Sequence, residues 1–232
     1  FSGSHQDAIN KGMARQREGQ QWYIPYLPID PTDVGRSYAS IIRVNSQSGK
    51  GGVAYVLKER FGYDIPAAMA AQVSEKVQAY SEAKGGVVSE EEILEIFQRH
   101  FVNVDGPFAI ENPDISMKAN DAAVSATIRI EEKRFRYRET GSGVIEIVSR
   151  MIRKGGLSFE MAHYSEHAIG PGSDASAVAY IGVHMNDALY LGAGEGENIT
   201  SASVHALQSA INRALQAQEK LDTILPKKCV EA

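Results

Sequence analysis

The hydrophobic period changes along this chain, and that change constrains the fold more than any other feature of the sequence. In the first part, apolar side chains recur at helical spacing, as Ile93, Phe97 and Phe101 do. Beyond residue 107 the period becomes two, and the segment VSATIRI at 124–130 alternates small or apolar residues with polar ones. We therefore predict an α+β protein in which helices precede a sheet-forming region.

The sheet-forming region repeats one order of elements. Residues 107–156 contain strands followed by a helix in GSGVIEIVSRMIRKGG, and residues 157–218 contain three strand-like runs followed by a helix in ITSASVHALQSAINRALQAQ. We therefore predict two βββα units, each with a glycine-containing loop ahead of its helix. Because a half-buried sheet must cover its apolar face, we expect the units to join their sheets and lay both helices on them.

Start and stop signals divide the first part of the chain into helices. We expect one helix near 6–17, capped by Ser4, ahead of the turn-rich segment PYLPIDPTDVG. Further helices are predicted in GGVAYVLKERFG, in the run that Pro66 opens and Gly85 closes, and after the capping residue Ser89.

Composition excludes some classes of function. With 24 basic and 29 acidic residues the formal charge is −5, which disfavours a general nucleic-acid binder or a polybasic membrane-surface protein. No apolar run approaches the roughly 20 residues that span a bilayer. The single cysteine, Cys229, cannot form an internal disulfide, so a reducing compartment is expected. The sequence opens without an initiator methionine or a secretory signal, and we expect it to be a fragment of a longer protein.

Residue spacing does not predict a metal or phosphate site. His163 and His167 have the spacing of helical zinc ligands, but their context reads as a strand, where four residues separate two side chains by roughly 13 Å. The segment SGKGG, which contains Lys50, lacks the full phosphate-loop pattern. A tight glycine turn is the simpler interpretation, although backbone amides there could attract an anion.

His5 has two open interpretations. Its imidazole could bond the local backbone at a helix start, or it could transfer protons, since histidine titrates near neutrality. The sequence offers no nucleophile with a recognisable partner, so a catalytic His5 needs a site supplied elsewhere.

Three segments carry a resemblance to a known family. They are SGSHQDAINKG near the N-terminus, YLPIDPTDVGRSYASIIRVNSQSGKGGVAYVL at 26–57, and TSASVHALQSAINRA. In these segments, and over nearly its whole length, the chain resembles the C-terminal half of the long form of 2-isopropylmalate synthase. The resemblance implies two linker subdomains at 1–50 and 51–106, a leucine-binding regulatory domain at 107–222, and a tail at 223–232.

The resemblance also implies an activity for the full enzyme. The family condenses acetyl-CoA with 2-oxoisovalerate in leucine biosynthesis, and an upstream TIM barrel carries out most of this acyltransferase chemistry with a divalent metal (magnesium, manganese or zinc). The barrel is not in this chain, so we expect no cofactor here and no release of CoA by the chain alone. The partners implied are leucine as feedback effector, the two substrates, and a second protomer in a homodimer, but no nucleic acid or membrane. The implied location is cytoplasmic, or an organelle in a eukaryote.

Carried over residue by residue, the resemblance assigns a catalytic and an effector site. His5 matches a histidine that reaches into a barrel active site, in the dimer that of the partner protomer, where it helps to enolise the acetyl group. Tyr26 matches a tyrosine close to that site. For the effector, a glycine loop holds the carboxylate or amine of leucine through backbone groups, and apolar residues form the wall, although these could also be plain sheet core. The effector residues are Gly141, Gly143, Met161, Tyr164, Ala168 and Ile199.

The chain departs from the family pattern near the expected pocket. Val144 and Glu146 stand where a proline and a small residue are usual, and Glu195 and Glu197 occupy the second glycine loop, GAGEGEN. A carboxylate beside the isobutyl group of leucine opposes binding unless it faces solvent, so an altered response to leucine is expected.

Two alternatives stay open at this point. The chain could be a free-standing amino-acid-sensing module, or the same region of a citramalate or homocitrate synthase. The segment SGSHQDAI favours an enzyme, because a free sensor has no need of a catalytic-site segment. The long linker match favours 2-isopropylmalate synthase.

Overall fold

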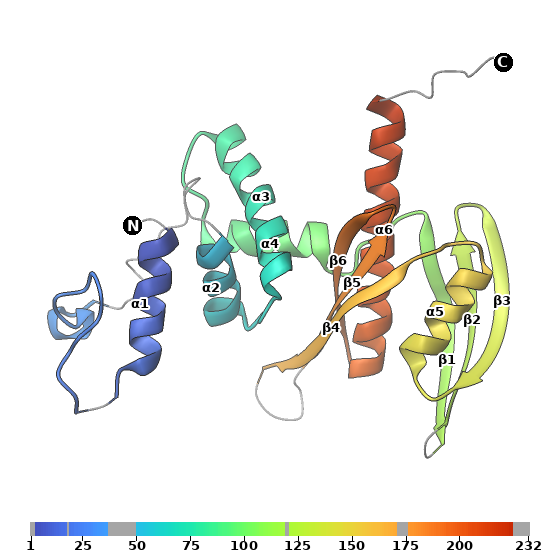
Figure 1. Cartoon of the computed structure of the whole chain (residues 1–232), viewed down its shortest axis with the longest axis horizontal. Helices are drawn as coiled ribbons and strands as arrows, with labels where there is room; N and C mark the ends of the chain where they lie inside the picture. The colour runs from blue at the N-terminus through green and yellow to red at the C-terminus, as the bar shows by residue number, and fades with distance from the viewer. Residues whose placement is uncertain (1–2, 18, 37–49, 119–120, 171–175, 225–232) are drawn as a thin grey trace. The chain divides into compact units, whose positions relative to one another are not determined.

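The computed structural model describes residues 3–17, 19–36, 50–118, 121–170 and 176–224. The chain divides into two compact units, unit 1 (residues 1–97) and unit 2 (residues 98–232) (Figure 1). The described part of unit 1 is helical, whereas unit 2 combines antiparallel strands with helices. The predicted α+β class is confirmed.

The helices of unit 1 follow the predicted start and stop signals, with one exception. The αL conformation of Gly85, at φ 70°, ends the third helix, and Pro66 precedes it, as expected. The first helix begins at Gly3, so the expectation that Ser4 caps it is wrong. Serine is tolerated inside a first turn and does not by itself fix the boundary. The elements are α1 (Gly3–Arg15), the 3-10 helix η1 (Pro31–Val34), α2 (Lys50–Phe61), α3 (Ala67–Lys84) and α4 (Glu90–Phe101), whose last four residues belong to unit 2.

A capping box starts α4, as Ser89 predicts. The Ser89 amide donates to Glu92 Oε2 at 2.8 Å, and the Glu92 amide donates to Ser89 Oγ at 3.2 Å. Glu92 also accepts from Lys84 Nζ at 2.5 Å and from the Tyr80 hydroxyl at 2.9 Å. These donors, Lys84 above all, hold the pKa of Glu92 at about 2.

Unit 2 contains the two predicted βββα units. In each, three consecutive antiparallel strands form a sheet in sequence order, and a helix follows. The two sheets are separate, so the expectation that they join is wrong. Instead both helices lie between the sheets and cover both apolar faces: α5 packs on β2 and β3, whereas α6 packs on β5 and β6 and also contacts β1 (Figure 1). The elements are β1 (Phe108–Lys118), β2 (Asp121–Ile130), β3 (Lys133–Gly141), α5 (Val144–Lys154), β4 (Glu160–Ile169), β5 (Ser176–Met185), β6 (Ala188–Gly196) and α6 (Ile199–Ile224).

The last helix is longer than predicted. It runs to Ile224, past the expected end at residue 218 and into the expected tail, because the added sequence EKLD is rich in helix-forming residues. Residues 225–232, which include Cys229, lie outside the described part of the chain.

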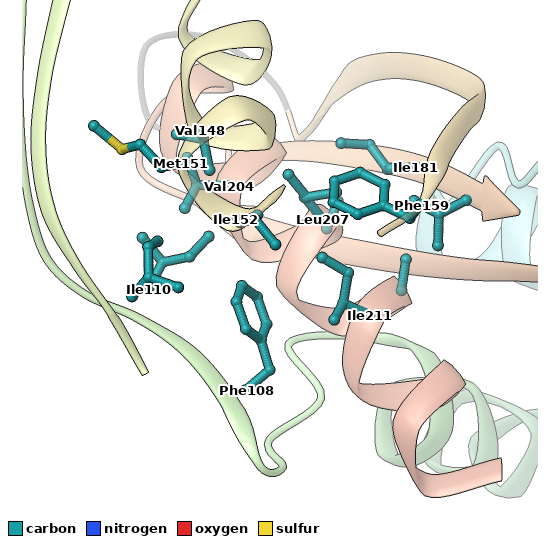
Figure 2. Close-up of a cluster of buried hydrophobic side chains, with 14 of the residues drawn as sticks. Phe108, Ile110, Val148, Met151, Ile152, Phe159, Ile181, Val204, Leu207 and Ile211 are labelled. Atoms are coloured by element: carbon teal, nitrogen blue, oxygen red, sulfur yellow. The ribbon is translucent and has the colours of Figure 1, made fainter. Parts of the chain in front are cut away.

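One hydrophobic cluster forms between the two sheets. Strand β1 contributes Phe108 and Ile110, helix α5 contributes Met151 and Ile152, and β5 and α6 close the cluster from the other side (Figure 2). All of these side chains are at least nine-tenths buried. The βββα units therefore share one core.

Three glycines of β6 let α6 lie directly on the sheet. Gly192, Gly194 and Gly196 alternate along the strand, so all three face α6. A Cβ on Gly194 would lie 2.1 Å from the carbonyl oxygen of Ala202 and 2.2 Å from the amide nitrogen of Ala206. The sequence GAGEGEN is therefore largely strand, and its prediction as a loop is wrong, because these glycines serve close packing rather than a turn.

Polar side chains of α6 fix the segment 102–110, which leads into β1. The fully buried Asn212 donates to the carbonyls of Val104 and Phe108 and accepts from the Phe108 amide, each at 2.9 Å. Ser209 Oγ accepts from the Val104 amide at 2.8 Å. Two further bonds of this kind join Gln208 to the Ile110 amide and Gln216 to the Asp105 carbonyl.

A buried arginine joins the end of α4 to the same helix. The Arg213 guanidinium lies 3.9 Å from the ring centroid of Phe101 and donates to the carbonyl of Leu191. Burial lowers the pKa of Arg213 to about 10, so the side chain stays charged at neutral pH.

We expect Gly194→Ala to destabilise unit 2 by at least about 2 kcal/mol, because the added methyl group meets the α6 backbone rather than a movable side chain. Hydrogen exchange of the most protected β5 amides measures the free energy of opening. Gly143→Ala is the control: its Cβ meets nothing within 4 Å, so we expect only the loss of the N-cap preference for glycine, about 1 kcal/mol or less. Equal effects from both variants would contradict the packing argument.

The capping box predicts acid sensitivity of α4. The pKa of Glu92 is lower in the folded chain than in the unfolded chain, so its stabilisation is present above the unfolded value of 4.5 and is lost as the pH falls toward 2. Protection factors of the α4 amides should therefore decline over this range. In Glu92→Gln the decline should be smaller, since no charge is lost. An equal decline in both proteins would exclude Glu92 as the cause.

Candidate functional site

A pocket of about 320 Å³ lies where the first turns of α5 and α6 approach β4. Its surface is mostly apolar, and it receives residues from both βββα units. The size suits a small amino acid or a similar ligand. The lining residues are Met117, Gly143, Val144, Ile145, Glu146, Met161, Tyr164, Ile199, Thr200 and Ser203.

Gly143 leaves the start of α5 open toward this pocket. It is the N-cap residue, with extended φ −145° and ψ 137°, and no side chain caps the helix. A Cβ at this position would meet nothing within 4 Å. The amides of the first turn have no partner inside the helix, so the opening suits a carboxylate.

Tyr164 and Ser203 supply a polar edge to the apolar wall. The Tyr164 hydroxyl lies 2.9 Å from Ser203 Oγ and donates to Glu166. Ser203 Oγ also donates to the Ile199 carbonyl at 2.7 Å. Burial and the neighbouring Glu166 carboxylate raise the pKa of Tyr164, so its phenol stays protonated and keeps its one hydrogen on Glu166.

The structure brings together four of the six predicted effector residues. Gly143, Met161, Tyr164 and Ile199 all line the pocket. Gly141 and Ala168 do not line it. Gly141 is the last residue of β3, where a Cβ would meet Glu146 and Ile147, and Ala168 lies four residues beyond Tyr164 on β4. Four residues of strand span roughly 13 Å, which takes Ala168 beyond the pocket.

Several lining residues are absent from the sequence prediction. Ser203 stands four positions after Ile199 on α6, and this helical spacing could have identified it, whereas Thr200 directly follows Ile199 and carries no such signal. Met117 comes from β1 of the other βββα unit, and nothing in its local sequence indicates a pocket.

Of the acidic residues expected near the pocket, only Glu146 lines it. Its carboxylate lies 2.8 Å from Arg150 Nη1 on the next turn of α5. Glu195 lies in β6, where its backbone amide donates to Asn103 Oδ1 at 3.0 Å, and Glu197 is exposed. Neither of these two lines the pocket.

In unit 1, the two predicted catalytic residues are in contact. The rings of His5 and Tyr26 pack edge to face, with centroids 4.4 Å apart. Tyr26 is 57% exposed and adopts a left-handed φ of 65° in a turn closed by the Ile24–Leu27 bridge. Trp22 Nε1 donates to the Leu27 carbonyl at 2.7 Å and braces this turn. A left-handed conformation at a tyrosine costs backbone energy, which the contacts of this turn must offset.

The other candidate motifs are placed as follows. His163 and His167 lie on strand β4, as expected, and Lys50 is the first residue of α2, while Ser48 and Gly49 lie outside the described residues. Within the described ranges, no group of three or more His, Cys, Asp or Glu side chains could hold a metal ion. Among the same residues, no helix is both long and apolar enough to cross a membrane.

Comparison with known proteins gives consistent matches along the chain. Residues 1–58 match the alpha-isopropylmalate synthase post-catalytic domain-like family, and residues 87–215 match the LeuA allosteric (dimerisation) domain. The 2-isopropylmalate synthase of Pseudomonas syringae pv. tomato is 42% identical over 222 residues, covering 95% of this chain and 39% of that protein. The 2-isopropylmalate synthases of Pseudomonas putida GB-1 and Pseudomonas fluorescens SBW25 are each 40% identical and cover 94% of the chain. The chain spans 39% of the length of these relatives.

Proposed function

Because the chain belongs to the LeuA allosteric (dimerisation) domain family and matches the C-terminal regulatory region of 2-isopropylmalate synthases, we propose that it binds leucine and regulates such an enzyme. The proposed full-length enzyme condenses acetyl-CoA with 2-oxoisovalerate in a catalytic domain outside this chain. The observation that carries the proposal is the 320 Å³ pocket, which combines an uncapped helix start with an apolar wall.

Each part of leucine has a counterpart in this pocket. The carboxylate is placed at the open first turn of α5 beside Gly143, where backbone amides and the helix dipole favour an anion. The ammonium group faces the Glu146 carboxylate, which lines the same pocket. The isobutyl group packs against Val144, Met161 and Ile199.

In this arrangement Glu146 contributes to binding by facing the ammonium group of leucine. Glu146 is half-exposed and paired with Arg150, so its charge is already solvated at the pocket rim and does not enter the apolar wall. We infer that leucine, or a close branched-chain analogue, remains the effector.

The His5–Tyr26 pair belongs to the proposed catalytic function. Edge-to-face packing against Tyr26 fixes the orientation of the His5 imidazole, which proton transfer to or from an acetyl group requires. The catalytic domain completing this site, its divalent metal and a homodimeric assembly are all part of the proposal. The described residues offer no cluster that fits the metal, so no step through it is assigned to this chain.

We expect calorimetric titration of the chain to show binding of leucine, with weaker binding of isoleucine and valine and none of lysine. At a hundredfold excess over its dissociation constant, leucine should stabilise unit 2 by about 2.7 kcal/mol. Gly143→Val should abolish binding without unfolding the chain, because its backbone is extended and the new side chain enters the opening. Ala168→Val should bind like the parent, since Ala168 lies outside the pocket. No heat from any branched-chain amino acid would refute leucine as effector.

In the intact synthase that contains this chain, we expect His5→Ala to lower the turnover number about 10²-fold or more, as for a positioned acid-base group. The KM for 2-oxoisovalerate should change less. Tyr23→Ala is the matched control, because this nearby ring is 89% exposed. An unchanged turnover number for His5→Ala would assign the imidazole to a structural role.

A further inference from the structure

A tyrosine occupies the glycine position of a tight turn in unit 1. Residues 24–27 form this turn, in which the Leu27 amide donates to the Ile24 carbonyl at 3.2 Å. Pro25 takes the second place and Tyr26 the third, where φ is 65°. A proline followed by a positive φ is the pattern of a type II turn, whose third place usually holds glycine. The backbone energy that Tyr26 costs must therefore be offset by contacts of the turn.

One face of α1 carries His5 and also holds this turn. His5, Ile9 and Gly12 follow one another at spacings of four and three residues, so they share a face of the helix. Ile9 is buried in one hydrophobic cluster with Ile24 and Leu27, the first and last residues of the turn. The contacts that fix the turn and the imidazole therefore lie on the same helix face.

Gly12 lets the turn lie close to the helix backbone. A Cβ at this position would lie 2.9 Å from Cδ of Pro25 and 3.2 Å from Cγ2 of Ile24. Pro25 Cδ belongs to a ring closed onto the backbone, so it cannot swing aside as the end of a flexible side chain would. Glycine inside a helix is less favourable than alanine, and this contact is a physical reason for a glycine here.

Trp22 holds the other end of the turn. Its Nε1 donates to the Leu27 carbonyl at 2.7 Å, and its ring packs against the same hydrophobic cluster. The chain ahead of Trp22 is itself fixed, because Gln16 Nε2 donates to the carbonyls of Gln20 and Gln21 at 3.3 and 3.2 Å. The turn is thus held by the helix at Pro25 and by the indole at Leu27.

We propose that Gly12 and Trp22 are positioning residues for His5, an inference that rests on the catalytic function proposed for His5. Together they hold Tyr26 in its left-handed conformation, with its ring edge to face against the imidazole at a centroid distance of 4.4 Å. An imidazole that transfers a proton must keep its orientation, so a displaced turn lowers the turnover number more than it weakens substrate binding.

The geometry is tested first in the chain itself. With ¹³C-labelled histidine, NMR should show nuclear Overhauser effects between the ring protons of His5 and Tyr26, and His5→Ala identifies the signals. Gly12→Ala should lose these effects although alanine favours the helix, and the Cα shifts of α1 should stay helical. Ala14→Gly is the matched control, because it changes helix propensity in the opposite sense at an exposed position of α1. It should keep the ring contact.

Further variants separate the individual contacts. Trp22→Phe keeps an aromatic ring but loses the Nε1 donor, and it should weaken the same ring effects. Tyr23→Phe, which removes a polar atom from a neighbouring ring that is 89% exposed, should leave them unchanged. Pro25→Ala removes the ring carbon that Gly12→Ala would strike, so the loss should be smaller in the double variant than in Gly12→Ala alone.

Kinetics then test the consequence in the intact synthase that contains this chain. Gly12→Ala should lower the turnover number at least about tenfold and change the KM for 2-oxoisovalerate by less than about twofold. Trp22→Phe should act in the same direction, whereas Ala14→Gly and Tyr23→Phe should keep the parent turnover number.

The possible failures can be told apart. Retention of the ring contact in Gly12→Ala would overturn the proposal, and so would a parent-like turnover number in Gly12→Ala when His5→Ala is strongly impaired. A raised KM with an unchanged turnover number would also overturn it, because a misplaced imidazole acts on the chemical step. Full turnover in His5→Ala would refute the proposed catalytic function, and this inference with it.

Discussion

The contact of α6 with β6 at backbone distance is the constraint on which unit 2 depends. Gly192, Gly194 and Gly196 leave the second half of this strand face without side chains, and the buried residues Ala202, Ala206 and Ala210 lie against it on the helix. Because the residues on both surfaces are small, the backbones of α6 and β6 pack directly against each other at one distance. Since α6 also contacts β1, its depth on one sheet sets where the other sheet and the shared core lie.

The same contact positions the first turn of α6 at the 320 Å³ pocket. This turn follows β6 after a short connection at 197–198, and Asn198 caps it by accepting from the Ser201 amide at 2.9 Å. The α5 start is different: a glycine holds the N-cap position, and no side chain occupies it. One helix start is thus capped by a side chain, and the other has no side-chain cap.

Local signals in the sequence predicted local structure well. Ser89 marks a capping box that forms as expected, and Gly85 ends α3 in the αL conformation. The glycines of β6 led to a wrong prediction of a loop. They alternate along a strand and let the backbone of α6 approach closely, rather than forming a turn. The separation of the two sheets could not be predicted from the strand patterns, because either arrangement buries the same alternate residues. Met117 belongs to the pocket through a contact between distant segments, which no local pattern encodes. Gly143, Met161, Tyr164 and Ile199 were found through family resemblance rather than physical derivation.

The hydrogen bonds from α6 side chains to the segment 102–110 affect the order in which the chain can fold. Asn212 hydrogen-bonds to Phe108 and Val104, which lie 104 and 108 positions earlier in the sequence, so these contacts close long loops. Strand β1 pairs with β2, and the carbonyls of Gly106 and Pro107 accept from Arg129, but the bonds of Val104 to Ser209 and Asn212 can form only after α6 has been synthesised. Such non-local contacts slow folding and leave early strands exposed for longer. The segment that leads into β1 is therefore fixed only after α6, about a hundred residues later in the sequence, has formed.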